Sequence, residues 1–378
     1  MEHIKQPYPE VEVQNRKPAL AYYITPHGFG HGVRSCEILR RLLDLKPDLK
    51  AIIISDLPEF FIEQNIGRRV EVRRLRLDVG LYQYDGIRFD LERTLTILNR
   101  IHADSELIIR DEEHFLKENG IDVVISDIAS LPFEAACRCG IPSIGISNFT
   151  WDWIYQAYAN VDPRWNKIIE WIREGYSKGD LFLQLPMNGD CSAFRSIVEV
   201  PLVARQAVRA RNEVRSALGV AAEEPVILVS FTGLDLEEKA LGNIRKIRGI
   251  TFIYKSPLKF PVEGAVAIDG ADLSYTDAVA AADAVITKPG YGIVSDCLAS
   301  GASLIYTERG LFPEYEILVK AIQENLNSVF IDSRDFAAGN WEASIRSILS
   351  QPRKMPVMRT DGAGKILEFI NGRRSRIP

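Results

Sequence analysis

The stretch from Lys288 to Gly301 combines a cation, closely spaced glycines and an acid. A strand-like apolar run (284–287) ends just before it, and helical spacing starts near Ile293. Backbone N–H groups at such a helix start, with the helix dipole behind them, suit a diphosphate. Asp296 could accept hydrogen bonds from both ribose hydroxyls. The alternative is a plain tight turn followed by an ordinary acid, and the spacing fits neither a dinucleotide fingerprint nor a Walker loop.

A second glycine-rich segment runs from Thr25 to Arg34 and holds His27 and His31, two of the five histidines of the chain. It follows the first apolar run, and its three glycines leave backbone exposed to a ligand. An imidazole there can serve as a base near neutral pH. No further ligands at metal-binding spacing stand nearby, so we expect no metal site. Structural histidines in a turn are the alternative.

Three further positions are candidates for chemistry. Lys288 could neutralise negative charge on a bound diphosphate, and a lysine exposed at a strand end is the alternative. Asp152 stands among four aromatic residues (Phe149, Trp151, Trp153, Tyr155) that could stack on a sugar or fill the space between domains. Asp127, at a strand end, is either a carboxylate in a cleft or a helix N-cap.

The composition indicates an ordinary globular protein. The 378 residues are 46% hydrophobic and 26% charged, with a net charge of −5, which argues against nucleic-acid binding. The five cysteines are scattered and odd in number, which favours a reduced, cytoplasmic setting. The N-terminal residues are polar, and no apolar run reaches the roughly 20 residues that span a bilayer. A peripheral membrane contact and the oligomeric state stay open.

Alternating strand and helix patterns predict two parallel α/β domains. We expect a first domain over residues 1–203 and a second over 204–378, with a last helix at about 361–372 crossing back to the first domain. The expected strands end at Thr25, Ser55, Asp127 and Ser147 in the first domain and at Ser230, Tyr254, Ile268, Thr287, Tyr306 and Ile331 in the second. Ligands of such sheets bind at the carboxyl ends of the strands.

These motifs resemble GT-B glycosyltransferases of the MurG type. They resemble most closely the glycosyltransferase-like N-terminal region of plant L-arabinokinase and its bacterial relatives. The resemblance covers about residues 19–372 and is carried by His27–His31 with Arg34, Ser126–Asp127, Ser147–Tyr155, Val200–Val203 and Lys288–Gly292. It implies a GT-B fold, in which two Rossmann-like domains face each other across a cleft.

The resemblance also implies roles for single residues. Asp296 would hold the ribose, and His31 would activate the acceptor or contact phosphate. The diphosphate turn would comprise Gly290, Tyr291, Gly292 and Ile293, the base would be read by Asp272, Leu273 and Tyr275, and the donor sugar would lie near Glu314, Tyr315 and Glu316. Thr232 and Gly233 stand where these proteins carry a double glycine, so their phosphate role is less secure.

We therefore expect an inverting, metal-independent transferase that moves a sugar from a nucleoside diphosphate, with UDP the expected nucleotide. The nucleotide sugar is a co-substrate and no cofactor is expected. The acceptor, a small molecule, glycan or lipid, would lie beside His27 and His31. Two alternatives stay open. One is a nucleotide-sugar epimerase, and the other is a catalytically silent nucleotide-sugar-binding or regulatory module.

Overall fold

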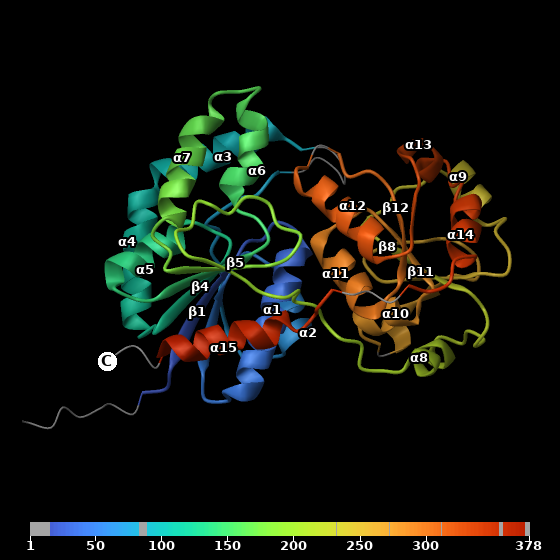
Figure 1. Ribbon diagram of the computed structural model, residues 1–378, viewed down its shortest axis with the longest axis horizontal. Helices are drawn as coiled ribbons and strands as arrows, with labels where there is room; N and C mark the ends of the chain where they lie inside the picture. The colour runs from blue at the N-terminus through green and yellow to red at the C-terminus, as the bar shows by residue number, and fades with distance from the viewer. Residues whose placement is uncertain are drawn as a thin grey trace, which may run out of the picture.

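The computed structural model describes residues 16–82, 89–231, 233–271, 273–310, 312–354 and 358–374. Within these ranges the strands form two wholly parallel sheets, which lie side by side in Figure 1. The first contains, in spatial order, β3 (Glu71–Arg73), β2 (Lys50–Ile54), β1 (Ala19–Ile24), β4 (Val123–Asp127), β5 (Ser143–Ser147), β6 (Leu181–Gln184) and β7 (Ile197–Glu199). The second contains β10 (Val266–Ala267), β9 (Thr251–Tyr254), β8 (Val226–Ser230), β11 (Ala284–Thr287), β12 (Ser303–Tyr306) and β13 (Ser328–Phe330).

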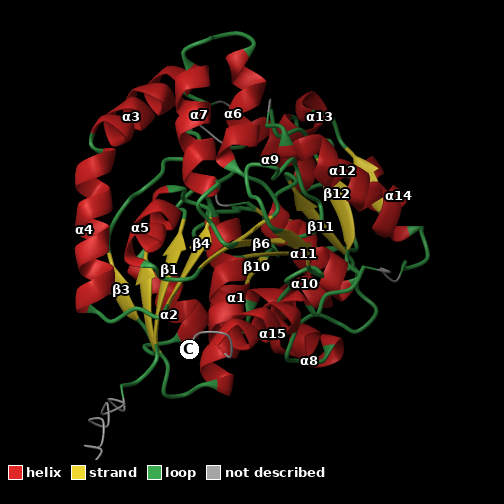
Figure 2. Ribbon diagram, turned by 60° about the vertical axis from the view of Figure 1, so that its left-hand side comes forward, coloured by secondary structure: helices red, strands yellow, loops and turns green. Residues whose placement is uncertain are grey.

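Helices cover both faces of each sheet (Figure 2). The first sheet is accompanied by α1 (Phe29–Leu45), α2 (Glu59–Ile66), α3 (Leu91–Ala103), α4 (Ser105–Glu118), α5 (Leu131–Cys139), α6 (Trp151–Ala159) and α7 (Trp165–Tyr176). The second is accompanied by α8 (Arg211–Ala217), α9 (Glu238–Ile244), a 3-10 turn (Ile268–Ala271), α10 (Tyr275–Ala281), α11 (Tyr291–Ser300), α12 (Glu314–Asn325), α13 (Ser333–Ala337) and α14 (Glu342–Leu349). This is the predicted alternation of strands and helices.

Strand β1 shows why the sheet needs helices on both sides. Leu20, Tyr22 and Ile24 pack into one apolar cluster, while the alternate residues Ala21 and Tyr23 pack into another, and all are buried. Successive side chains of a strand point to opposite faces. An apolar run without alternation is therefore typical of a central parallel strand. The edge strands β3 and β7 are short and carry weaker patterns. Strands β6 and β7 were not predicted.

The two glycine-rich segments differ in one respect from the prediction. Helix α1 begins at Phe29, inside the glycine-rich segment, so His31 lies in the first helical turn instead of a loop. Helix α11 begins at Tyr291 rather than near Ile293. In both cases the helix starts directly after a glycine, Gly28 or Gly290, and no side chain caps it.

The last helix, α15 (Gly362–Arg374), follows the second domain but packs against α1 of the first, as Figure 1 shows. Ile366, Leu367 and Ile370 are buried in the cluster that includes α1. The backbone N–H of Gly362 donates to the Leu202 carbonyl oxygen at 3.1 Å. The two segments joining the domains therefore run side by side.

Two glycines of α15 give a matched test of this docking. A Cβ at Gly362 would collide with the Pro201 carbonyl oxygen, whereas a Cβ at Gly364 would meet nothing within 4 Å. We expect Gly362→Ala to lower the free energy of unfolding by about 1–3 kcal/mol through overpacking. Gly364→Ala should raise it by about 0.5–1 kcal/mol through better helix propensity. Urea unfolding followed by circular dichroism checks both, and equal shifts in the two variants would contradict the docking.

Candidate functional site

Strand order reverses once in each sheet, between β1 and β4 in the first and between β8 and β11 in the second. Helix α1 follows β1 and α11 follows β11, so each helix starts at the carboxyl end of its sheet beside the reversal. Such switch points are where open α/β sheets bind ligands. The two helices pack on each other, and a Cβ on Gly292 would lie only 3.5 Å from Gly30 Cα. The two switch points therefore meet.

A buried polar cluster lies at the first switch point, centred on Asp127 at the end of β4. His31 Nδ1 lies 2.7 Å from Asp127 Oδ1, and Arg34 donates to both carboxylate oxygens at 2.7 Å. Ser35 Oγ donates to Oδ2 at 2.8 Å. Burial alone would raise the pKa of the Asp127 carboxyl, but the charges and hydrogen bonds of Arg34 and His31 hold that pKa well below its usual range. Asp127 is therefore a carboxylate and not a helix N-cap.

These contacts decide which nitrogen of His31 is available. Arg34 Nη2 also lies 2.7 Å from His31 Nδ1. The two protons of Arg34 Nη2, however, are already donated to Asp127 Oδ1 and to Ser147 Oγ. An ionised carboxylate can only accept, so we assign the Nδ1 proton of the neutral ring to the bond with Asp127. The second ring nitrogen, Nε2, is then unprotonated. His31 is thus oriented as a base by Asp127.

His27 has a different environment. The Leu81 backbone N–H donates to His27 Nδ1 at 3.2 Å, and the ring lies edge-on to Trp151 and stacks on Phe312 of the second domain. Burial, aided by the nearby charges of His31, Arg309 and Lys288, lowers the pKa of His27 to about 3. A group with so low a pKa is a weak base at neutral pH. The structure therefore makes His27 a packing residue beside His31.

Two buried acids flank the aromatic residues. Asp152 pairs with Arg173 of α7 at 3.6 Å, and no described contact joins it to His31. Asp78, which sequence reasoning missed, accepts from Thr25 Oγ1 at 2.7 Å and from Trp151 Nε1 at 3.0 Å. Burial raises the pKa of Asp78 to about 6. Asp78 thus holds the end of β1 and the Trp151 ring in place.

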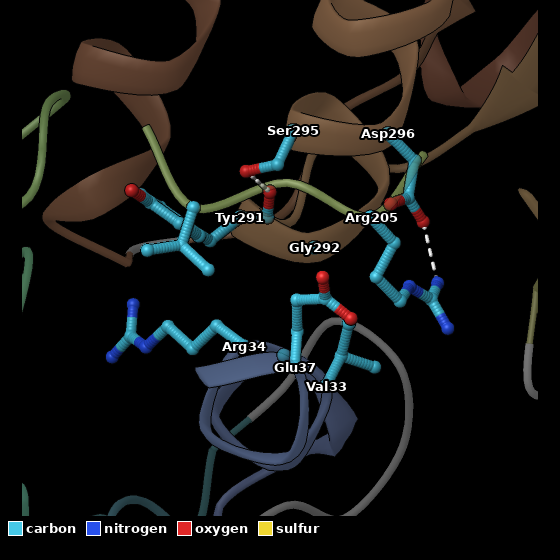
Figure 3. Close-up of a pocket in the computed structure, with 10 residues that line it drawn as sticks. Val33, Arg34, Glu37, Arg205, Tyr291, Gly292, Ser295 and Asp296 are labelled. Atoms are coloured by element: carbon cyan, nitrogen blue, oxygen red, sulfur yellow. Dashed lines mark hydrogen bonds and ion pairs between the residues drawn. The ribbon is translucent and has the colours of Figure 1, made fainter. Parts of the chain in front are cut away.

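The second switch point holds Asp296. Its carboxylate is 3% exposed, and Oδ2 accepts from Arg205 Nη2 at 2.6 Å. Burial raises the pKa of Asp296, and the ion pair with Arg205 opposes the rise. Figure 3 shows the pair at one end of the gap between α1 and α11, with Glu37 of α1 facing it. The predicted ribose ligand is therefore already paired with an arginine.

Glu314 joins the two domains. Asn148 of the first domain donates to Glu314 Oε1 at 2.8 Å, and Arg309 donates to Oε2 at 3.0 Å. Asn148 also accepts from Arg34 Nη1 at 2.6 Å, and the Arg34 guanidinium lies 5.0 Å from the centre of the Tyr291 ring. A continuous polar chain thus runs from the His31 cluster to α12.

The other predicted binding residues spread around this centre. Leu273 is buried, and the hydroxyl of Tyr275 bonds to Ser230 at the end of β8. Gly233 is exposed, Lys288 and Ile293 are partly buried, and on α12 Tyr315 is partly buried and Glu316 exposed. Thr232 and Asp272 lie outside the described residues. No three His, Cys, Asp or Glu side chains in the described ranges lie together as a metal site would need.

Little room is left between the two helix starts. The cavity there has a volume of about 10 Å³ and is lined from both domains by Gly30, Val33, Arg34, Glu37, Val203, Arg205, Tyr291, Gly292, Ser295 and Asp296. Such a space holds about one water molecule. A ligand the size of a nucleotide does not fit between the two helix starts in this arrangement.

No protein-family profile matches the chain. Over 351 residues it is 30% identical to L-arabinokinase of Arabidopsis thaliana, covering 90% of this chain and 33% of that protein. The calicheamicin glycosyltransferase CalG4 superimposes with a TM-score of 0.64 at 13% identity, covering 96% of this chain and 100% of CalG4. Phytolacca americana UGT2, solved with UDP-2fluoro-glucose and pterostilbene, gives a TM-score of 0.58 at 12% identity, covering 94% and 93%.

The chain has the GT-B fold. This confirms the predicted fold class and the likeness to L-arabinokinase. The chain spans about a third of the length of L-arabinokinase. At the junction between the two domains, the first sheet with α1 lies on one side, and α11 with α12 lies on the other.

Sequence reasoning missed several residues of the cluster between the two domains. Arg34 and Asn148 were noted only as parts of motifs, and their mutual hydrogen bond could not be foreseen. Arg205 was not among the predicted binding residues, although it is the direct partner of Asp296. One signal was available: an arginine shortly after the Val200–Val203 motif, on the segment that joins the two GT-B domains.

The environment of His27 predicts its titration. Its pKa of about 3 lies below the ordinary value of 6.5, so the folded state resists protonation and its stability falls as the pH drops below about 6.5. In ¹⁵N NMR of the imidazoles, we expect the His27 signals to stay constant from pH 8 to pH 5. A midpoint for His27 near 6.5 would contradict its assigned environment.

Proposed function

We propose that this protein is a glycosyltransferase that moves a sugar from a nucleoside diphosphate, with UDP the expected nucleotide, to an acceptor hydroxyl. The observation that carries the proposal is the meeting of two switch points: α1, which carries the Asp127-oriented imidazole, packs on α11, whose start is uncapped, across the domain junction. The imidazole of the first domain can take a proton, and the start of α11 in the second domain can hold a diphosphate. The GT-B neighbours named above, one solved with a UDP-sugar analogue and a second small molecule, support this combination.

The chemistry assigned to these residues is a single displacement. The acceptor oxygen attacks the anomeric carbon while the bond from that carbon to the phosphate oxygen breaks. His31 Nε2 takes the hydroxyl proton, and Asp127 stabilises the imidazolium that forms. The nucleoside diphosphate leaves with the bonding electrons, and the N–H groups at the start of α11 stabilise its charge. Displacement in one step inverts the configuration of the sugar.

On the donor side we propose Asp296 for the ribose and Gly290–Ile293 for the diphosphate. Glu314 is proposed for the sugar hydroxyls, because it lies on the polar chain that leads to His31. The base would lie near Leu273 and Tyr275. We propose that these groups act without a divalent cation, since no Asp-x-Asp motif stands at a strand end and α11 already offers N–H donors.

Two observations bear on the setting of this chemistry and on the nature of its acceptor. None of the described helices has the length and apolarity needed to cross a membrane. The acceptor side of the proposed site is rich in aromatic rings, with Phe149, Trp151 and Phe312 around the two histidines. We propose a cytoplasmic enzyme whose acceptor carries an apolar or ring-shaped group next to the reacting hydroxyl.

Turnover of UDP-sugars with and without a panel of hydroxyl acceptors tests the proposal. A transferase releases UDP faster when its acceptor is present, and the rate should persist in a chelator. Acceptor-independent formation of an isomeric UDP-sugar would indicate an epimerase instead. Binding of UDP-sugar without any turnover would indicate a silent binding module, and no binding at all would contradict the assigned donor site.

The role of His31 has its own test. His31→Ala should lower turnover by about 10²- to 10⁴-fold, the usual contribution of a general base, while the affinity for UDP changes little. The exposed His114→Ala is the matched control and should keep full activity. A normal rate in His31→Ala, or a larger loss in His27→Ala or Asp152→Ala, would move the base to another residue.

A further inference from the structure

Arg205 occupies an unusual position for a residue on a connecting segment. It lies between β7 and α8 and lines the cavity between α1 and α11 (Figure 3). Its Nη2 donates to Asp296 at 2.6 Å, and the side chain is 21% exposed. The acid proposed for the ribose is therefore held by a cation that belongs to neither helix.

The hydrogen bonds of Arg205 are incomplete. Its Nε atom is buried and has no partner among the described residues. Arg34, the other cation that lines the cavity, instead uses Nε, Nη1 and Nη2 on acceptors of the first domain. An unmet donor in a buried site costs free energy. Of the two arginines, Arg205 is the one with donors left for a ligand.

Charge balance points the same way. Asp296 and Glu37 place two carboxylates around the cavity. Arg40 and Arg41 pair with Glu37, but a diphosphate would add further negative charge beside Gly292. The helix dipole supplies only about half a charge at the start of α11. Buried anions need a paired cation. A ribose on Asp296 would leave Arg205 without its partner in the same cavity as the diphosphate.

We propose that Arg205 is a donor-binding residue that exchanges partners: it rests on Asp296 when the site is empty and turns to the diphosphate when the ribose takes its place. This inference rests on the proposed function. It makes the site selective for nucleoside diphosphates over nucleosides. A nucleoside has to displace Arg205 from Asp296 and offers the arginine nothing in return, whereas a diphosphate supplies a new anionic partner.

The test compares two ligands, UDP and uridine, by calorimetry in the wild type and in Arg205→Met, which keeps the length of the aliphatic stem. We expect the variant to bind UDP at least tenfold more weakly, because a charge-assisted hydrogen bond is lost. Uridine should bind as well as before or better, because its competitor for Asp296 is gone. The ratio of the uridine and UDP dissociation constants should therefore fall at least tenfold.

Two further variants complete the design. Arg205→Lys keeps a point charge, so its ratio should lie between those of the wild type and Arg205→Met, and it serves alone if the methionine variant does not fold. Arg209→Met removes an exposed arginine from the same segment and should leave the ratio unchanged. An unchanged ratio in both Arg205 variants overturns the inference while the proposed function stands. Failure of the wild type to bind UDP overturns both.

Discussion

The starts of α1 and α11 meet with Gly30 against Gly292, and the rest of the site depends on this contact. Neither helix has an acidic residue in its first turn, and neither has a side-chain cap. The positive ends of two helix dipoles therefore converge in a cavity about the size of one water molecule. Such an arrangement is stabilised by an anion, and the glycines leave the backbone N–H groups accessible to one.

In the structure, side chains already on the protein hold this junction together. Arg205 pairs with Asp296, Asn148 with Glu314, and Arg34 lies over the Tyr291 ring. In each contact, one residue is a proposed donor-binding residue of the second domain. Its partner lies in the first domain or, for Arg205, on the segment that connects the domains. A donor must break several of them on entering, so binding is coupled to the relative position of the two domains. The segment around residues 200–210 and the start of α15 join the domains, and these are where the movement would be absorbed.

Much of this architecture follows from local sequence. Apolar runs such as Ala284–Thr287 form the predicted central strands, because a strand buried on both faces has no other composition available. The edge strand β7 (Ile197–Glu199) has no such pattern and was missed. His31 and Asp296 could be named as candidates because one glycine-rich turn carries each of them. Their surroundings could not be predicted where residues far apart in sequence meet, as in Arg205 with Asp296 or Asn148 with Glu314, since no local pattern encodes such pairs.

The central claim is that the nucleotide binds between the starts of α1 and α11. Amide hydrogen exchange of the wild type, with and without saturating UDP, tests it most directly because it reports each backbone segment separately. The account predicts slower exchange at Tyr291, Gly292 and Ile293 in the presence of UDP, since these N–H groups would bond to the diphosphate. Unchanged exchange there, with protection appearing at another part of the chain, would contradict it.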